Sequence, residues 1–399
     1  WDANFGQRPF AHSVPTGFKT LNTDNFSINT PTIIRPQKHF KPVIYAGDNT
    51  EYRKIPLEFK ADLLWFKRRD ASGSHVLSDT VTGITKHLTP NDTSVQGSPA
   101  YPYVSDVEDN GIILRGSASS GGNVSGRSMV AWCWKGGGNS NTFNVDGKGY
   151  ASASAAGITE GNLAITGASI NREAGFSIVK FTANNNASAT IGHGLNSKPK
   201  FVIVKDTANS DDWQCKFIDD NIYVALNNNN AGSTSYGNYT ATDTLINLGY
   251  TWNNGSGTHV AYSWTNIPGY SKIGRYNALG STDGAYVDLG FRPAFILIRP
   301  TNNFGGSDQN YSTWGLWDSA RSTSNVVTYG GMLTANKNHA EQVRGNGSND
   351  GALAAFDILG TGFKVRQSSY EVGYSGDYYY MAFAEQPGES PYHTDTNAG

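Results

Sequence analysis

The sequence contains little cysteine, and its two cysteines, Cys133 and Cys215, lie far apart along the chain. Neither belongs to a Cys-x-x-Cys or Cys/His spacing, so a zinc site is not indicated. Two cysteines in a chain of this length do not form a disulfide framework. We therefore expect the fold to be stabilised by packing or by oligomerisation, without a metal or other cofactor.

Charge is also scarce, because charged residues make up 16% of the chain and the formal net charge at pH 7 is −2. This composition gives no reason to expect the basic face of a nucleic-acid-binding protein. No apolar run reaches the length of a membrane-spanning helix and no signal-peptide pattern is present, so membrane insertion is not predicted. The chain begins at Trp1 rather than Met, which indicates a processed or truncated piece of a longer protein.

Helical periodicity is the third absence. No long segment has apolar residues at i, i+3, i+4 and i+7, and the Ala-rich stretch 150–169 is interrupted by glycine too often to form a good helix. What is abundant is typical of strands and turns: 46 glycines, 12% aromatic residues, and much Asn, Ser and Thr. The composition therefore predicts an all-β protein with many turns.

Three sets of similar segments recur along the chain in the same order, which indicates internal repeats. The first set contains apolar strands that end in a basic residue: LLWFKRRD (63–70), FVIVKDTA (201–208) and FILIRPTN (295–302). The second set contains short strands that follow them: SHVLSD (74–79), DWQCKFID (212–219) and STWGLWD (312–318). The third set closes each unit and shares an apolar–Ala–aromatic core, aligned as Val-Ala-Trp, Val-Ala-Tyr and Met-Ala-Phe: 126–134, 257–264 and 376–385.

Each repeat is predicted to be one antiparallel β-sandwich of the jelly-roll or concanavalin-like kind, with long loops. The predicted boundaries are 38–135 for repeat 1, 175–268 for repeat 2 and 269–387 for repeat 3, with a tail at 388–399. Between the first two repeats lies a Gly/Ser/Ala/Asn-rich linker, 136–174. Its small residues predict no core of its own, and we expect it to lie extended along a neighbour or a partner chain.

The residues WCWKGGGNSNTFNVDGKGYASASAAG (132–157), followed by 165–206, closely resemble repeats of bacteriophage tail structural proteins. The closing segment 377–388 resembles the end of such a module. The opening segment 1–23 resembles the last strand of a SPRY-like β-sandwich with the junction after it, so 1–37 is interpreted as the end of an upstream SPRY-like domain plus a linker. The resemblance implies a virion component of a tailed phage, such as a tail fibre or tailspike, which is commonly a homotrimer and carries no catalytic motif.

Candidate catalytic and metal-binding residues have plainer interpretations. His193 lies between two glycines, but the equivalent turns of the other repeats have no histidine and no partner base or nucleophile is placed beside it, so a turn residue is favoured. A polysaccharide-depolymerising tailspike would need two carboxylates close together. The acidic clusters lie in different repeats: Asp106, Glu108 and Asp109; Asp211 and Asp212; Asp219 and Asp220. The loop 105–111 lacks the fixed spacing of a calcium site, so a solvated turn is favoured.

Aromatic, amide-rich loops are the candidate binding sites, because rigid rings with adaptable hydrogen-bonding neighbours suit glycan or protein surfaces. The candidate receptor-binding or glycan-binding residues are Tyr236, Tyr239, Phe304, Tyr311, Tyr370 and Tyr374. Ordinary turns, or loops buried between subunits, explain the same residues equally well.

The resemblance therefore implies a non-enzymatic phage structural protein, and we expect a tail fibre or spike that attaches to the host surface. Its expected partners are two further copies of the chain, other tail or virion proteins and a host-surface glycan or protein; its expected location is the virion, outside the cell when it functions. The alternatives are a polysaccharide depolymerase and a head-decorating fibre or adaptor with a purely structural role.

Overall fold

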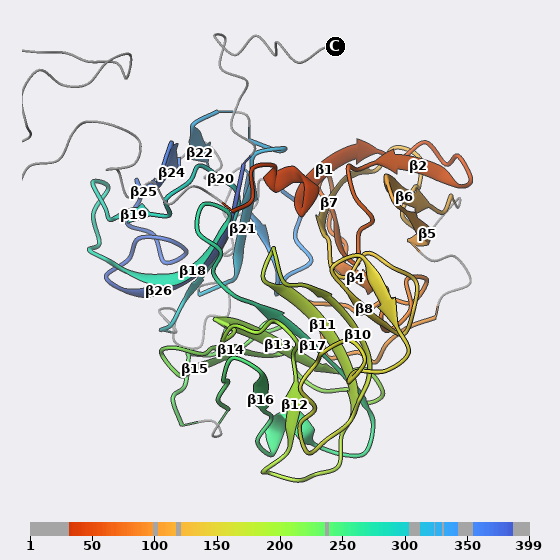
Figure 1. Cartoon of the computed structure of the whole chain (residues 1–399). Coiled ribbons are helices and arrows are strands. Elements are labelled where there is room, and N and C mark those ends of the chain that lie inside the picture. Colours follow the sequence, from red (N-terminus) through yellow and green to blue (C-terminus); the bar gives the residue numbers. More distant parts are fainter. Residues whose placement is uncertain are drawn as a thin grey trace, which may run out of the picture.

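The computed structural model describes residues 32–98, 103–116, 121–235, 239–302, 312–322, 324–328, 331–341 and 354–385. Its elements are β-strands apart from two short 3₁₀ turns, Pro36–Lys38 and Thr251–Asn253. The all-β prediction is therefore confirmed, and the strands form several sheets in which all the described strand pairs but one are antiparallel. No helix in these ranges is long and apolar enough to cross a membrane. Figure 1 shows the strands gathered into three lobes around a common centre.

Repeat 1 forms two sheets. The strand order of the larger sheet is β1-β7-β3-β4: β1 Phe40–Ala46, β7 Ser128–Trp134, β3 Leu63–Arg68 and β4 Val76–Asp79. The smaller sheet has the order β2-β6-β5: β2 Arg53–Pro56, β6 Gly111–Leu114 and β5 Val104–Glu108.

Repeat 2 has the same plan. Its larger sheet runs through β11 Phe176–Thr182, β17 Thr258–Trp264, β13 Phe201–Asp206, β14 Gln214–Phe217 and β15 Ile222–Ala225. Its smaller sheet consists of β12 Thr190–Gly192 and β16 Leu245–Asn247.

Repeat 3 repeats the order once more. Its larger sheet runs through β18 Ser271–Ala278, β26 Gly376–Ala384, β20 Pro293–Pro300, β21 Gly315–Asp318 and β23 Leu333–Thr334. Its smaller sheet runs through β19 Tyr286–Asp288, β25 Gly362–Val365, β24 Ala354–Leu359 and β22 Val326–Thr328. In every repeat the opening strand pairs with the closing strand, which pairs with the apolar strand.

The register corrects one detail of the sequence alignment. In β7 and β17 the last tryptophans, Trp134 and Trp264, lie opposite the first residue of the apolar strand, and in β26 Phe383 takes that place. Ala382 therefore corresponds to Cys133 and not to Ala131, so the alignment of the third closing strand was wrong by two residues. Side chains of a strand alternate with period two, so a shift of two leaves each residue on its face and is invisible in the pattern.

The segment 136–174 is not the coreless linker that its composition predicted. It forms three strands that extend the larger sheet of repeat 2 beyond β11: β10 Ile165–Asn171, β8 Phe143–Val145 and β9 Lys148–Tyr150. Ile158, Ala168 and Ile170 are buried in the core of that sandwich. Small side chains permit this packing, because a Cβ at Gly137 would come within 2.4 Å of the Asn144 carbonyl oxygen.

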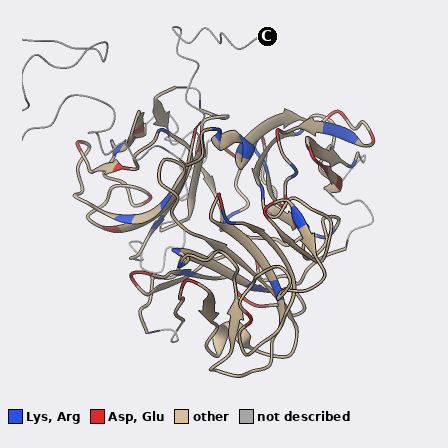
Figure 2. Ribbon diagram, in the orientation of Figure 1, with Lys and Arg blue, Asp and Glu red and all other residues tan. Residues whose placement is uncertain are grey.

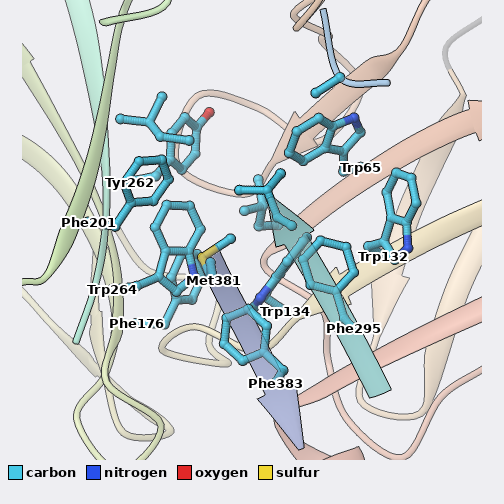
Figure 3. Packing of buried hydrophobic residues seen from close by; sticks show 14 of the residues in the cluster. Trp65, Trp132, Trp134, Phe176, Phe201, Tyr262, Trp264, Phe295, Met381 and Phe383 are labelled. Atoms are coloured by element: carbon cyan, nitrogen blue, oxygen red, sulfur yellow. The ribbon is translucent and has the colours of Figure 1, made fainter. Parts of the chain in front are cut away.

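The apolar strands β3, β13 and β20 are buried on both faces. Alternate residues of each strand point into the core of its own sandwich: Leu64 and Phe66, Val202 and Val204, Ile296 and Ile298. The intervening residues belong to one cluster that all three repeats build together: Leu63 and Trp65, Phe201 and Ile203, Phe295 and Leu297. We call this cluster the shared core. Figure 3 shows its aromatic rings converging from strands of all three lobes.

The shared core is rich in aromatic side chains. The ring of Trp134 from repeat 1 lies 6.3 Å from Trp264 of repeat 2 and 5.9 Å from Phe383 of repeat 3. Fully burying one large apolar side chain stabilises a protein by about 1.5–3 kcal/mol. The repeats are therefore held together by a core of the same kind as those inside the sandwiches, in a pseudo-threefold arrangement within one chain.

Candidate functional site

Two of the six predicted binding residues lie together in the structure. Tyr370 and Tyr374 are on the loop between β25 and β26, with ring centroids 4.6 Å apart at an interplanar angle of 38°. The Tyr374 side chain is 43% exposed. The loop is fixed from below, because the Tyr378 hydroxyl donates to the Tyr370 carbonyl oxygen at 3.0 Å and the Tyr276 hydroxyl donates to the Val372 carbonyl oxygen at 2.7 Å. The result is a rigid aromatic pair at the surface of repeat 3.

Tyr239 does not lie at a loop tip, and its place in the predicted surface set needs correction. Its side chain is 1% exposed and its ring stacks on Trp252 at 4.4 Å, with an angle of 8° between the planes. The ammonium group of Lys216 lies 4.9 Å from the ring centroid on a cation–π contact. The polar neighbours of Tyr239 in the sequence indicated exposure, but stacking on Trp252 places the ring in the core of repeat 2. Tyr236, Phe304 and Tyr311 lie outside the described residues.

His193 is a buried residue of the turn that follows β12. Its side chain is fully buried, its Nδ1 accepts from the Leu195 backbone N–H at 3.3 Å, and its Nε2 lies 3.2 Å from the Thr242 carbonyl oxygen. Burial lowers the pKa of His193 to about 4. Both ring nitrogens therefore contact the backbone, and the neutral ring is the form that this environment favours.

The candidate carboxylates are dispersed and take part in local contacts. Glu108 pairs with Lys54 at 2.6 Å, Asp219 pairs with Lys200 at 2.7 Å, and Asp212 accepts from the Asn227 amide at 2.7 Å. The segment 105–111 is not the loop that was predicted: residues 105–108 belong to β5 and Gly111 to β6, so the turn between them is Asp109-Asn110. Within the described ranges, no group of three His, Cys, Asp or Glu side chains is placed to hold a metal ion.

The structure shows a set of buried polar groups whose role the sequence did not predict. The basic residue that ends each apolar strand is fully buried: Lys67, Lys205 and Arg299. Each donates to a backbone carbonyl oxygen of the next repeat. The contacts are Lys205 Nζ to Thr93 at 3.2 Å, Lys67 Nζ to Asn338 at 3.5 Å, and Arg299 Nη2 to Asn230 at 2.5 Å. They run from repeat 2 to repeat 1, from 1 to 3 and from 3 to 2, and so close a ring.

A second ring of contacts follows the same direction. In each repeat this contact is made by the ring side chain that directly precedes β4, β14 or β21, the strand that follows the apolar strand. These residues are His75, Trp213 and Trp314. His75 Nε2 lies 2.9 Å from the Thr334 oxygen, Trp213 Nε1 donates to Thr89 at 3.0 Å, and Trp314 Nε1 donates to Ala225 at 2.9 Å. The sequence did carry a signal for these two sets of contacts, because a basic residue and a ring residue recur at equivalent positions of the three repeats.

A third set of contacts is polar at two of its three positions. The Tyr262 hydroxyl donates to Asp79 Oδ2 at 2.8 Å, and Trp132 Nε1 donates to Asp318 Oδ2 at 2.8 Å. Burial raises the pKa of Asp79, although its hydrogen bonds oppose that shift. Asp318 also pairs with the buried Arg321 guanidinium at 2.6 Å. At the third position Phe217 replaces the carboxylate and stacks on Tyr379 with ring centroids 4.4 Å apart.

These contacts give the ionisable residues of the interior a structural use. A buried charge must have a partner, since leaving it unpaired costs several kcal/mol. Lys67, Lys205 and Arg299 contact carbonyl oxygens of a neighbouring repeat. Arg321 pairs with Asp318 inside repeat 3, and the buried Lys216 lies on the Tyr239 ring inside repeat 2. Figure 2 shows the remaining charged residues scattered over the three lobes without an extended stretch of one sign.

The comparison with known families matches the whole set of repeats at once. The model of a family described as Domain of unknown function (DUF7483) matches residues 35–387. No curated protein and no solved structure matches the chain. The matched range contains all three repeats.

Proposed function

Because the chain belongs to the family described as Domain of unknown function (DUF7483), whose description names no activity, we propose its function from the residues and their geometry. The protein is a non-enzymatic component of a tailed-phage virion, a tail fibre or spike that attaches to the host surface. It works outside the cell, joined to other virion proteins, and its ligand is a host-surface glycan or protein.

The observation that carries this proposal is the position of the ionisable side chains. Lys67, Lys205 and Arg299 are fully buried and contact carbonyl oxygens of the neighbouring repeat. Acid–base catalysis needs titratable groups that converge on an open pocket with shifted pKa values. Here the cations support a rigid body, while the half-buried Tyr370 and the exposed Tyr374 supply a surface of the kind that binds glycans and proteins.

Oligomerisation into a homotrimer is part of the proposal. β1 and β18 end their sheets without a further partner strand among the described residues, whereas β11 at the equivalent place pairs with β10. Open sheet edges in a β-rich protein are usually covered or blunted. A second and third copy would cover them, and repeated copies would raise avidity. Light scattering of the purified chain should give three times the monomer mass, and a monomer would overturn this part.

Two assays test attachment against degradation. The purified chain is incubated with cells of the bacterium that the phage infects, and bound protein is measured after washing. The same chain is incubated with polysaccharide from those cells, and new reducing ends are measured. We expect binding without new reducing ends. Release of reducing ends that is lost on Asp219→Asn or Asp212→Asn would show a depolymerase instead.

A further inference from the structure

A polar cleft of about 490 Å³ lies between repeats 1 and 2. One wall comes from the repeat 1 segment that follows β4, and the other from β10, β11 and the residues beside β13 and β17. Its lining includes Thr82, Lys86, Gln96, Lys180, Thr207 and Thr258. Clefts that bind small ligands commonly have volumes of about 300–1,000 Å³.

The chemistry of the lining is hydroxyl, amide and ammonium. No Asp or Glu is among the described residues that line it. Lys180 Nζ donates to the Val81 carbonyl oxygen at 3.1 Å, and in the described part of the chain neither Lys180 nor Lys86 has a carboxylate within 4.0 Å. Two cations without carboxylate partners beside several hydroxyl groups suit a ligand that is both anionic and rich in hydroxyls.

The walls of the cleft are fixed by hydrogen bonds. The Gln96 amide donates to Thr82 Oγ1 at 2.7 Å, and that hydroxyl donates to Asp79 at 2.7 Å. The Thr207 hydroxyl donates to the Thr258 carbonyl oxygen at 2.8 Å. The Gln96 backbone N–H donates to the Thr207 carbonyl oxygen at 2.9 Å and joins the two walls. A site fixed in this way loses little conformational entropy when a ligand binds.

The pseudo-threefold arrangement supplies an internal comparison. Between repeats 3 and 1 the Glu341 backbone N–H donates to the Arg69 carbonyl oxygen at 2.8 Å, as Gln96 does to Thr207. The cleft there has a volume of about 300 Å³ and is lined by Arg69, Asp70, Ser128 and Glu341. Its Arg69 guanidinium pairs with Glu341 at 2.5 Å. Glu341 therefore occupies the place that Gln96 has in the cleft between repeats 1 and 2. The cation Arg69 already has a carboxylate partner, whereas Lys86 and Lys180 have none among the described residues.

We propose that the cleft between repeats 1 and 2 binds a short anionic segment of a surface saccharide. Lys86 and Lys180 contact its carboxylate or phosphate, and the threonine hydroxyls and Gln96 bind its hydroxyl groups. This proposal names a ligand class for the attachment function above and rests on it. The cleft between repeats 3 and 1 binds no such ligand, because its own carboxylates neutralise its cations.

The test uses the full chain and three soluble probes in calorimetric titrations. They are trigalacturonic acid, which is carboxylated; glucose 6-phosphate, which is phosphorylated; and maltotriose, which is neutral. At least one anionic probe should bind and maltotriose should not, and the probe that binds identifies the anion as carboxylate or phosphate. Failure of both anionic probes, or equal binding of maltotriose, overturns the proposal.

Variants assign binding to the cleft. Lys86→Ala with Lys180→Gln removes both cations of the cleft and should weaken binding about tenfold, since exposed ion pairs contribute only modestly to affinity. Gln96→Glu places the carboxylate of the second cleft in the first and should weaken binding to a similar degree. The control is Lys148→Ala, which removes an exposed lysine of β9 outside the cleft and should change nothing. Unchanged binding in both cleft variants, with melting temperatures like that of the parent chain, overturns the proposal.

The cell-binding assay separates failure of the cleft from failure of the attachment function. If the parent chain binds cells but neither anionic probe, the cleft proposal is overturned and attachment stands on other surfaces such as Tyr370 and Tyr374. If the chain binds an anionic probe through Lys86 and Lys180 but no cells, the cleft proposal is supported and the attachment function is overturned.

Discussion

Removing the Tyr262 hydroxyl tests whether the shared core makes the three repeats one cooperative unit. Tyr262→Phe keeps the ring in place and removes its hydrogen bond to Asp79, which joins repeat 2 to repeat 1. Asp79 keeps its contacts with the Val81 and Thr82 backbone N–H groups and the Thr82 hydroxyl. A buried hydrogen bond to a charged group contributes about 1.5–3 kcal/mol. We therefore expect the free energy of unfolding to fall by about 2 kcal/mol.

The shift in melting temperature depends on the size of the unit that unfolds. At about 2.1 cal/mol/K per residue, unfolding of residues 35–387 as one unit has an entropy of about 0.7 kcal/mol/K, so a loss of about 2 kcal/mol lowers the melting temperature by about 3 °C. A single repeat of one third that size would shift by about 8 °C. The unfolding enthalpy near 60 °C is about 250 kcal/mol for the whole range and one third of that for a single repeat.

Differential scanning calorimetry distinguishes these cases. We expect one peak, whose calorimetric and van 't Hoff enthalpies agree and which Tyr262→Phe lowers by about 3 °C. Tyr276→Phe is the matched control, because it removes a hydrogen bond to the Val372 carbonyl oxygen within repeat 3. The control should lower the same peak, by a smaller amount. Separate peaks, with Tyr262→Phe and Tyr276→Phe moving different ones, would refute a cooperative shared core.

Three further predictions concern named side chains. The pKa of His193 is about 4 in the folded chain and about 6.5 in the unfolded chain, so the unfolded state takes up the proton first. The free energy of unfolding should therefore fall by up to about 3 kcal/mol as the pH drops from 6.5 to 4. Urea midpoints at pH 7 and 4.5, with and without His193→Gln, measure the contribution of this residue. Tyr239→Ala should cost about 3–5 kcal/mol by the same assay, whereas Tyr374→Ala should cost less than about 0.5 kcal/mol yet reduce cell binding. Asp318→Asn leaves the Arg321 charge buried without its ion pair at that oxygen and should cost about 3–5 kcal/mol in urea unfolding; a cost below about 1 kcal/mol would contradict the role given to this pair.

Local pattern predicted the strands well because each one carries its own signal. The apolar strands, the strands that follow them and the closing strands all lie in the expected segments. The four consecutive apolar residues of Leu63–Phe66 also indicate a strand buried on both faces. That signal, read in all three repeats, points to a second core beside each sandwich core, and the sequence interpretation assigned only the first.

The segment 136–174 shows how composition conceals short strands. Small residues and glycines are typical of linkers, yet Asp146-Gly147 between Phe143–Val145 and Lys148–Tyr150 is the two-residue turn of a hairpin. In the structure both turn residues have positive φ, 49° and 83°. The dipeptide was the local signal for β8 and β9, whereas the pairing of β10 with β11 depends on the fold of repeat 2.

The contacts between repeats could not be predicted from local pattern. Tyr262 and Asp79 are 183 positions apart, and Trp132 and Asp318 are 186 positions apart. Their approach depends on how three sandwiches pack, which no spacing along the chain encodes. For the same reason the cleft between Lys180 and Gln96 has no motif, since its walls come from different repeats.

Joining the three repeats in one chain has a consequence for specialisation. In a trimer of identical subunits, a substitution appears three times, so every interface and every cleft changes together. Here Gln96 and Glu341 occupy matching places but are encoded separately, as are Asp79 and Phe217. One cleft can therefore acquire a new ligand while another keeps its ion pair to hold the body together, a division of labour that identical subunits do not permit.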